Sequence, residues 1–444
     1  MAVTTAGALA GTITGWRCAA CGAEVSIATA LPFRCPNDRG DRHHVLMAVG
    51  ATAPVEVVDD PNPFVAFDAG FAWAAFAAAH GMDAAARAAL VRDLDQRVAA
   101  VAGVGFRATP MRRADALSDK LGFAATGGVW VKDETGNVAG SQKARHLFSI
   151  LLHLHAAEHL GLAPWTAVAD RPPLAISSCG NAAIAASTLA AALGWRIRVF
   201  VPPWASDAVL ARLHALHAEV NICPRLPDDP PGDPCVHRFR EAVAAGALPF
   251  AVQGPENALC LDGGRTLGWE ILAAASAQGV ALDRVFVQVG GGAFAAAVGA
   301  ALQSAPVPPR LMAVQTEGCA PLAGAWSRAQ HLAAGVGAAG SHWSECMRVW
   351  GAEGEPEPHS AADGILDDET YDWLGITAAL AATGGDVVVA AEADVVAAHR
   401  IGTMLTGIDA TPTGTAGLAG LLAVRATLAD TERLAVVFSG VTRR

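Results

Sequence analysis

Lysine is scarce in this chain of 444 residues, which contains only Lys120, Lys132 and Lys143. Any chemistry that needs a lysine amine therefore has three candidates. Long apolar runs are missing too, because the alanine-rich stretches 69–79 and 182–193 are shorter than the roughly 18 apolar residues that a membrane span needs. The N-terminal residues lack the basic start of a secretory signal. We therefore expect a cytoplasmic protein with no membrane partner.

Basic residues are also in the minority, with 31 Lys and Arg against 42 Asp and Glu, for a formal net charge of -11. This balance disfavours nucleic-acid binding, which needs a basic surface. The nine cysteines show no evenly spaced disulfide framework, which fits reduced thiols. Apolar material is abundant, since hydrophobic residues make up 52% of the chain and charged residues 16%. This length and composition predict two or three domains with large cores.

Lys143 follows a pattern that predicts a strand, a loop and a helix. Val129 to Val131 are β-branched and aromatic, as is typical of a strand, and residues 133–140 hold the Gly, Asn and Thr of a loop. The apolar residues after Lys143 recur on one helical face. A lysine at a helix start feels the positive end of the helix dipole, which favours a nucleophilic amine that can form a Schiff base. The alternative is a solvated helix residue, the commoner role of a single lysine.

The residues around this lysine carry a family resemblance. The run from Asn137 to Arg145, Asn-Val-Ala-Gly-Ser-Gln-Lys-Ala-Arg, resembles the Asn-x-Thr-Gly-Ser-Phe-Lys-x-Arg signature of pyridoxal-phosphate enzymes of fold type II, the tryptophan synthase β-like superfamily. Threonine and serine dehydratases, threonine synthases and cysteine synthases belong to it. The resemblance implies that Lys143 holds pyridoxal 5'-phosphate as a Schiff base and is catalytic. Ala139 replaces the usual Thr and Gln142 the usual Phe, which leaves the substrate open more than the cofactor.

A second motif is the polar turn 177–181, which lies between a predicted strand and a predicted helix. Free backbone N–H groups at such a helix start can bind an anion or a carboxylate. The turn resembles the Ser-Ser-Gly-Asn loop of the same enzymes, which implies that Asn181 faces the 3'-oxygen of the cofactor and that Ser177 and Ser178 bind the substrate. Cys179 stands at a position that can influence proton transfer. A catalytic role for Cys179 and a role as a small buried filler both stay open.

A third motif is Gly290-Gly291-Gly292-Ala293, between a predicted buried strand at 285–289 and an alanine-rich helix. Glycines let backbone amides close on a phosphate at a helix N-terminus. Three glycines before a helix are weak support alone. They resemble the loop that binds the cofactor phosphate in dehydratases, with Ala293 in place of the fourth glycine. A nicotinamide-binding fold would need Gly-x-Gly-x-x-Gly and an acidic residue about 20 positions later, and neither is in place.

The last motif is Ser439, at the end of a predicted buried strand, 434–438. It resembles the Ser that follows the last strand in dehydratases and lies opposite the pyridine nitrogen. A hydroxyl there leaves the ring nitrogen largely neutral, which suits β-elimination or replacement over transamination. The alternative is a serine in a turn. Thr413, in a run that resembles Glu-Pro-Thr/Ser-Gly-Ala-Ala-Gly with Thr411 for the Glu, is a candidate for substrate binding and the next candidate for the ring nitrogen.

The N-terminal segment resembles a zinc ribbon, because Cys18-x-x-Cys21 is followed by Cys35. A ribbon needs two such pairs so that four ligands surround the metal. The second pair has one cysteine, and Asp38 stands where the fourth ligand is expected, with His43 or His44 as alternatives. Some threonine synthase relatives carry a similar ribbon with four cysteines. A ribbon that folds without metal stays open, so zinc is a possible second cofactor with these predicted ligands: Cys18, Cys21, Cys35 and Asp38.

Together the motifs predict an α/β fold with two open twisted-sheet domains, the cofactor in the cleft between them and a small zinc-ribbon-like segment in front. The ribbon-like segment is expected at 14–50. The larger cofactor domain would combine 63–145 with 263–444, and the smaller domain with the Asn loop would span 146–262. The four motifs follow one another in the family's order, which is hard to obtain by chance.

Three functions are compatible with these motifs. The first is a pyridoxal-phosphate lyase that acts on threonine or serine by β-elimination and gives a 2-oxo acid and ammonia. The second is threonine synthase-like chemistry or β-replacement on an O-phospho or O-acetyl amino acid, which the ribbon favours. The third is a zinc-ribbon interaction protein on an inactive scaffold, which Lys143 opposes. We expect a small amino acid as substrate, no nucleic-acid partner and a homodimer.

Overall fold

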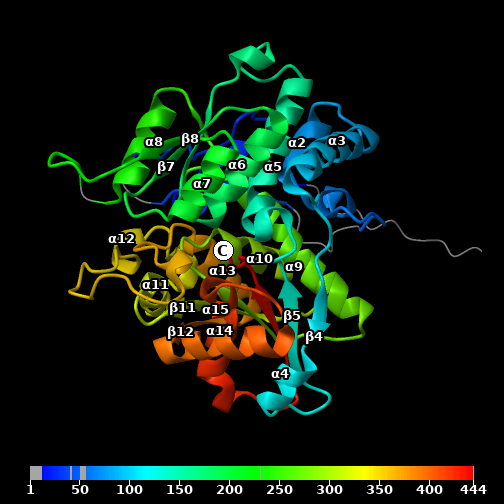
Figure 1. The fold of residues 1–444 in the computed structure, drawn as a ribbon, viewed down its shortest axis with the longest axis vertical. Helices are drawn as coiled ribbons and strands as arrows, with labels where there is room; N and C mark the ends of the chain where they lie inside the picture. Colours follow the sequence, from blue (N-terminus) through cyan, green and yellow to red (C-terminus); the bar gives the residue numbers. More distant parts are fainter. Residues whose placement is uncertain (1–12, 41–42, 51–56, 231, 444) are drawn as a thin grey trace, which may run out of the picture.

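The computed structural model describes residues 13–40, 43–50, 57–230 and 232–443. It contains three sheets, with strand orders β2-β1-β3, β12-β11-β10-β13-β5-β4 and β8-β7-β6-β9. In Figure 1 the six-stranded sheet lies in the lower half of the view with α14 and α15, and the four-stranded sheet lies in the upper half with α6 to α8. The predicted α/β fold with a ribbon-like N-terminal segment is confirmed.

The six-stranded sheet brings together the strand that precedes Lys143 and the strand that precedes Ser439. β5 (Gly128–Asp133) and β13 (Arg433–Phe438) pair in parallel, so that Asp133 lies opposite Phe438. Carboxyl ends of parallel strands share one edge, where α/β proteins bind ligands. The other strands are β4 (Met111–Arg113), β10 (Arg284–Gln288), β11 (Arg310–Thr316) and β12 (Asp386–Ala390), and only β4 runs antiparallel to its neighbour.

The four-stranded sheet is entirely parallel. Its strands are β6 (Leu174–Ser177), β7 (Ile197–Val201), β8 (Glu219–Ile222) and β9 (Leu248–Pro249). Every strand of this sheet lies within 146–262, and every strand of the six-stranded sheet lies outside that range. The exact domain boundaries stay a prediction.

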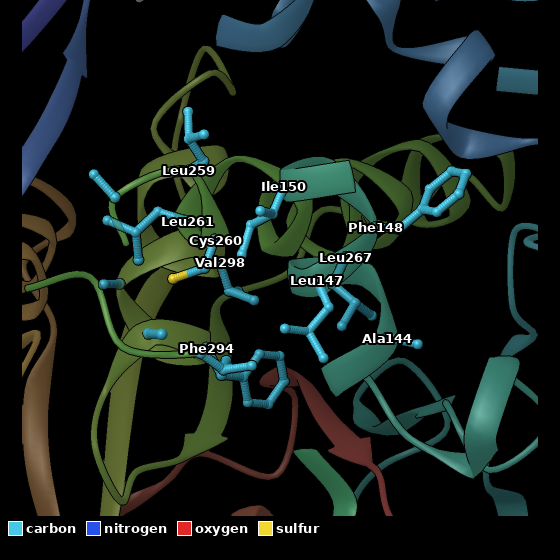
Figure 2. Packing of buried hydrophobic residues seen from close by; sticks show 14 of the residues in the cluster. Ala144, Leu147, Phe148, Ile150, Leu259, Cys260, Leu261, Leu267, Phe294 and Val298 are labelled. Atoms are coloured by element: carbon cyan, nitrogen blue, oxygen red, sulfur yellow. The ribbon is translucent and has the colours of Figure 1, made fainter. Parts of the chain in front are cut away.

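Three helices form the packed layer between the sheets: α5 (Lys143–His159), α9 (Cys260–Ala277) and α10 (Ala293–Leu302). Glycine permits their close approach, because a Cβ added to Gly263 would overlap the carbonyl oxygen of Arg145. Figure 2 shows Leu147, Leu267 and Phe294 in the shared buried layer. The start of α5 is therefore held against a rigid support.

The remaining helices cover the sheets. Among the described residues, no helix is both long and apolar enough to cross a membrane. Their bounds are α1 (Pro63–Ala66), α2 (Ala72–Ala79), α3 (Ala84–Ala102), α4 (Asp115–Lys120), α6 (Asn181–Leu193), α7 (Asp207–Ala215), α8 (Pro234–Ala244), α11 (Pro321–Gln330), α12 (Trp343–Cys346), α13 (Trp373–Thr383), α14 (Glu392–Thr406) and α15 (Pro412–Val424).

The N-terminal segment is a small antiparallel sheet of β1 (Gly15–Cys18), β2 (Glu24–Ser26) and β3 (Leu46–Val49). It packs on the rest of the molecule through backbone contacts. The carbonyl oxygen of Phe33 accepts a hydrogen bond from the N–H of Ala258 at 2.9 Å, and the carbonyl oxygen of Ala30 lies 2.7 Å from Nε2 of His153. The segment is therefore part of the packed molecule near the start of α9.

Candidate functional site

Lys143 is the first residue of α5, at the edge where β5 ends. Its side chain is partly buried, and its amine has no hydrogen bond or ion pair with the described residues. Burial lowers the pKa of Lys143, and the nearby Asp367, Cys260 and Asp372 oppose that shift. A lowered pKa and the lack of a hydrogen-bonding partner both make an amine a better nucleophile or base than an ordinary lysine.

Arg145, two residues further on, anchors the start of α5 in a fully buried ion network. Its Nε and Nη2 lie 2.8 and 3.0 Å from the carboxylate oxygens of Glu134, and its Nη1 lies 2.5 Å from Glu270 Oε1. The Nζ of Lys132 lies 2.5 Å from Glu270 Oε2. Burial alone would lower the pKa of Arg145, but Glu134 and Glu270 raise it above its ordinary value. In this network the cations Arg145 and Lys132 face the carboxylates of Glu134 and Glu270. The amine of Lys132 therefore has a partner, whereas the amine of Lys143 has none among the described residues.

Ser439 lies at the end of β13, beside the start of α5. Its Oγ accepts a hydrogen bond from the backbone N–H of Gln142 at 3.1 Å. Thr413 lies elsewhere on this edge, since its Oγ1 accepts from the N–H of Gly364 at 2.9 Å and donates to Asp363 Oδ1 at 3.2 Å. Ser439 therefore lies next to the start of α5, whereas the hydroxyl of Thr413 is bonded to Gly364 and Asp363.

Asn181 begins α6, and the rest of its turn lies just before it. Its side-chain oxygen accepts a hydrogen bond from Arg443, whose second nitrogen donates to the carbonyl oxygen of Ala139 at 2.7 Å. Gly440 has a φ of 95° and lets Asn181 approach, because a Cβ there would lie 2.9 Å from Asn181 Nδ2. Arg443 therefore links the Asn loop to the lysine loop, a role that no sequence motif indicated.

The other residues of this turn are placed at its solvent side. Ser177 ends β6, and Ser178 Oγ accepts from the N–H of Gly180 at 3.3 Å. Cys179 reaches solvent, and partial burial together with nearby carboxylates raises the pKa of its thiol. The thiol is therefore protonated at neutral pH and can act as a proton donor more readily than as a nucleophile.

The glycine loop faces residues 367–372, Asp-Asp-Glu-Thr-Tyr-Asp, which we call the acidic segment. A Cβ on Gly290 would overlap Asp367 Oδ2, and the backbone of Gly291 next to it helps to lower the pKa of the Asp367 carboxyl. Gly292 has a φ of 103° and precedes Ala293, the first residue of α10. The loop therefore precedes a helix N-terminus in the way that phosphate-binding glycine loops do, with Asp367 packed beside it.

Two carboxyls of the acidic segment, those of Asp367 and Asp372, have pKa values raised to near neutrality. Burial raises the pKa of Asp367 to about 6, with Lys143 acting in the opposite direction. Burial also raises the pKa of Asp372 to about 7, although both its oxygens lie 3.1 Å from the backbone nitrogen of Gly254. Neither residue belongs to a motif that the sequence indicated as functional. Near-neutral carboxyls beside a free amine are typical of catalytic sites.

A separate site lies in the N-terminal sheet. Its possible ligand atoms lie within 4.8 Å of one another, and they belong to Cys18, Cys21, Cys35 and His44. The Sγ atoms of Cys21 and Cys35 are 3.6 Å apart, and Cys18 Sγ is 3.4 Å from His44 Nδ1. Around a tetrahedral zinc ion with Zn–S near 2.3 Å, neighbouring ligand atoms are about 3.5–3.8 Å apart. The donor set and spacing fit Zn²⁺.

The fourth member of this group corrects the sequence-based choice of Asp38. His44 lies with the three thiols, whereas Asp38 Oδ1 accepts a hydrogen bond from the N–H of Gly40 at 2.9 Å. The physical reason is that β3 pairs with β1, so that the residues just before β3 return to Cys18. The pairing of these strands cannot be read from the spacing of the cysteines.

Comparison with known proteins gives the fold and the family model. The model described as "Pyridoxal-phosphate dependent enzyme" matches residues 104–440. No curated protein matches the sequence. Similar solved structures include threonine deaminase from T.th., with 22% identity, 80% of this chain and 98% of that chain covered, and a TM-score of 0.58. Diaminopropionate ammonia lyase from Escherichia coli is 18% identical, with 80% of this chain and 88% of that chain covered and a TM-score of 0.61. Maize serine racemase is 16% identical, with 80% of this chain and 93% of that chain covered and a TM-score of 0.59. At these identities the likeness shows the fold alone.

Proposed function

Because this chain belongs to the family of pyridoxal-phosphate dependent enzymes, we propose that it is a lyase that removes the β-substituent of a small amino acid such as threonine or serine and releases a 2-oxo acid and ammonia. The observation that carries the proposal is the unpartnered amine of Lys143 at the start of α5, with its pKa lowered by burial. Elimination needs a base, and burial lowers the pKa of this amine towards the range in which a base works.

The residues of the cleft fit the cofactor. Lys143 would hold it covalently, the amides of Gly290 to Gly292 would hold its phosphate, and Ser439 would lie at its ring nitrogen. Asn181 would face the ring oxygen. When bound, pyridoxal phosphate supplies an aldehyde that condenses with amines and a ring that withdraws electrons from the carbon beside the amine.

Each of these residues then has one task in elimination. Lys143, which would hold the cofactor, would also be the base that accepts the proton of the substrate α-carbon. The N–H groups of the turn at Ser177 and Ser178 hold the substrate carboxylate at the start of α6. The protonated thiol of Cys179, which is exposed, would donate a proton to the departing hydroxyl.

The hydroxyl of Ser439 supports elimination over transamination. A serine cannot keep the ring nitrogen protonated in the way that a carboxylate does, so the ring withdraws electrons less strongly. Such a ring would favour loss of the β-substituent over transamination. The fold alone would also accommodate a racemase, and the product mixture separates the two.

A threonine synthase-like or β-replacing enzyme is the second candidate, because relatives with that activity carry an N-terminal ribbon and this chain has a ribbon-like segment with a Cys/His group. The test is incubation of the cofactor-loaded protein with serine, threonine and O-phosphohomoserine. A 2-oxo acid from serine or threonine supports the lyase, and phosphate release from O-phosphohomoserine without a 2-oxo acid supports the second candidate. A homodimer is part of this proposal, and sedimentation of the loaded protein tests it.

A further inference from the structure

The Cys/His group in the N-terminal sheet is connected to the candidate active site through one residue. His43 directly precedes the ligand candidate His44, and its Nε2 lies 3.3 Å from Glu369 Oε2. The ring of His43 also packs against the ring of Tyr371, with centroids 5.3 Å apart. One face of the acidic segment is therefore held by the residue next to a metal ligand.

The opposite face of the acidic segment is held by the glycine loop. The N–H of Asp372 donates to the carbonyl oxygen of Gly291 at 2.9 Å, and the carboxyl of Asp367 packs against Gly290. A Cβ on Gly291 would lie 3.0 Å from the ring of Tyr371. The acidic segment thus lies between the N-terminal sheet and the loop that would bind the cofactor phosphate.

A second contact joins the N-terminal sheet to Asp372. Val45, one residue after His44, packs against Gly254, where an added Cβ would lie 2.9 Å from Val45 Cγ1. The N–H of Gly254 donates to the carboxylate of Asp372. The residues on either side of the ligand candidate, His43 and Val45, therefore support the same segment, His43 directly and Val45 through Gly254.

We propose that Cys18, Cys21, Cys35 and His44 bind one Zn²⁺ ion and that this ion fixes the acidic segment beside Lys143. Three strands of three or four residues have too small a core to hold their own loops, so a structural metal supplies the missing constraint. Without the ion, the loop that carries His43 loses its anchor, and the acidic segment loses its support on that face. The effect on cofactor binding rests on the proposed function, whereas metal binding and the movement of the acidic segment do not.

The chain contains a built-in reporter for this coupling, because Tyr371 is its only tyrosine. Biosynthetic 3-fluorotyrosine places a single ¹⁹F label between His43 and the glycine loop. We expect about one Zn per chain in the purified protein, as one tetrahedral site requires. Removal of the metal with a strong chelator should shift or broaden the ¹⁹F resonance, and added Zn²⁺ should restore it. Co²⁺ in place of zinc should show the thiolate charge-transfer absorption of a sulfur-rich site.

Matched variants separate the coupling from general damage to the fold. Glu369→Gln removes one charge and weakens the contact with His43 while all four ligands stay. It should keep the zinc but reduce the response of the Tyr371 resonance to metal removal, because only the ring contact between His43 and Tyr371 remains. Asp368→Asn removes the same charge from the neighbouring residue and should respond like the wild type. Asp38→Asn should keep normal zinc content, because Asp38 lies outside the ligand group.

The affinity for pyridoxal phosphate is the second quantity to measure. If the acidic segment is in place only about a tenth of the time without zinc, the apparent Kd for pyridoxal phosphate rises on the order of tenfold. Zinc-loaded Glu369→Gln should show a similar rise. The inference is overturned if the purified protein holds no zinc, or if it holds zinc but its Tyr371 resonance ignores metal removal. A protein whose Tyr371 responds to zinc but that binds no pyridoxal phosphate would instead refute the proposed function and leave the inference standing.

Discussion

Ser439 Oγ accepts a hydrogen bond from the backbone N–H of Gln142, although 297 positions separate the two residues in the sequence. The parallel pairing of β5 and β13 makes this contact, since both strands end at the same edge of the sheet. The hydroxyl is therefore held at the backbone of Gln142, the residue that precedes Lys143. A residue in this place can interact with whatever the lysine holds.

Replacement of Ser439 tests whether its hydroxyl sets the reaction type. Ser439→Ala should still bind the cofactor but turn over roughly tenfold more slowly, the effect of one lost hydrogen bond of about 1.4 kcal/mol. Ser439→Asp should raise the pKa of the ring nitrogen and shift products towards racemisation or transamination. The ratio of 2-oxo acid to side products measures this. If both variants keep normal turnover and product ratio, Ser439 is a turn residue and Thr413 becomes the next candidate.

Lys143 should carry the cofactor. Borohydride treatment of the loaded protein followed by peptide mapping is expected to place the label on Lys143, and Lys143→Ala should lower turnover by on the order of 10³-fold or more. Lys120→Ala is the matched control, because Lys120 is exposed at the end of α4 and should leave label and turnover unchanged. A label on Lys120 or Lys132 would remove the basis of the proposed function.

Asp372 should make stability depend on pH. Its folded pKa of about 7 lies above the ordinary value, so its stabilising contribution is present at low pH and is lost as pH rises towards 7. The Asp372→Asn side chain cannot ionise, so this variant should not lose stability as the pH rises. Its unfolding free energy minus that of the wild type should therefore be larger at pH 8 than at pH 5, by roughly 2–4 kcal/mol. Urea unfolding at both pH values measures the difference. Asp119→Asn, at an exposed position, is the control, and an equal gain at both pH values would contradict the assignment.

Local motifs could be predicted from the sequence because each one follows the end of a strand. Lys143, the glycine loop and Ser439 all combine a short apolar run with a small polar turn, and the structure has strands directly before them. The ion network was missed for the opposite reason. Lys132 and Glu134 read as a charged strand end, and only the packing of α5 against α9 reveals that Glu270 pairs with Lys132 and that Arg145 pairs with Glu134.

The choice of Asp38 as a metal ligand shows the same limit. Sequence spacing places Asp38 three residues after Cys35, as in a regular second cysteine pair. The spatial neighbour is His44, because antiparallel pairing of β3 with β1 decides which residue returns to Cys18. Pairing between strands depends on long-range packing and leaves no local signal. Arg443 was missed likewise, since its two partners lie in other motifs far along the chain.

Arg443 should control the orientation of the Asn181 amide. It donates to the side-chain oxygen of Asn181 and to the carbonyl oxygen of Ala139, a non-glycine residue with a φ of 56°. With its oxygen occupied, Asn181 can present only its NH₂ group to the cleft, which is the donor that a negatively charged ring oxygen needs. Loss of Arg443 frees the amide to rotate and opens the link between the Asn loop and the lysine loop.

Arg443→Ala should therefore raise the Kd for pyridoxal phosphate by about tenfold, since hydrogen bonds to charged groups contribute roughly 1.5–3 kcal/mol and part of this is retained by water. Arg443→Lys should restore only part of the affinity, because a single ammonium cannot span both acceptors in the way that a planar guanidinium does. Arg400→Ala removes an exposed arginine of α14 and serves as the control. The measurement is an absorbance titration of the cofactor at constant ionic strength. Equal affinities for wild type and Arg443→Ala would mean that Asn181 is oriented by the backbone at Gly440 and that Arg443 only closes the surface of the cleft.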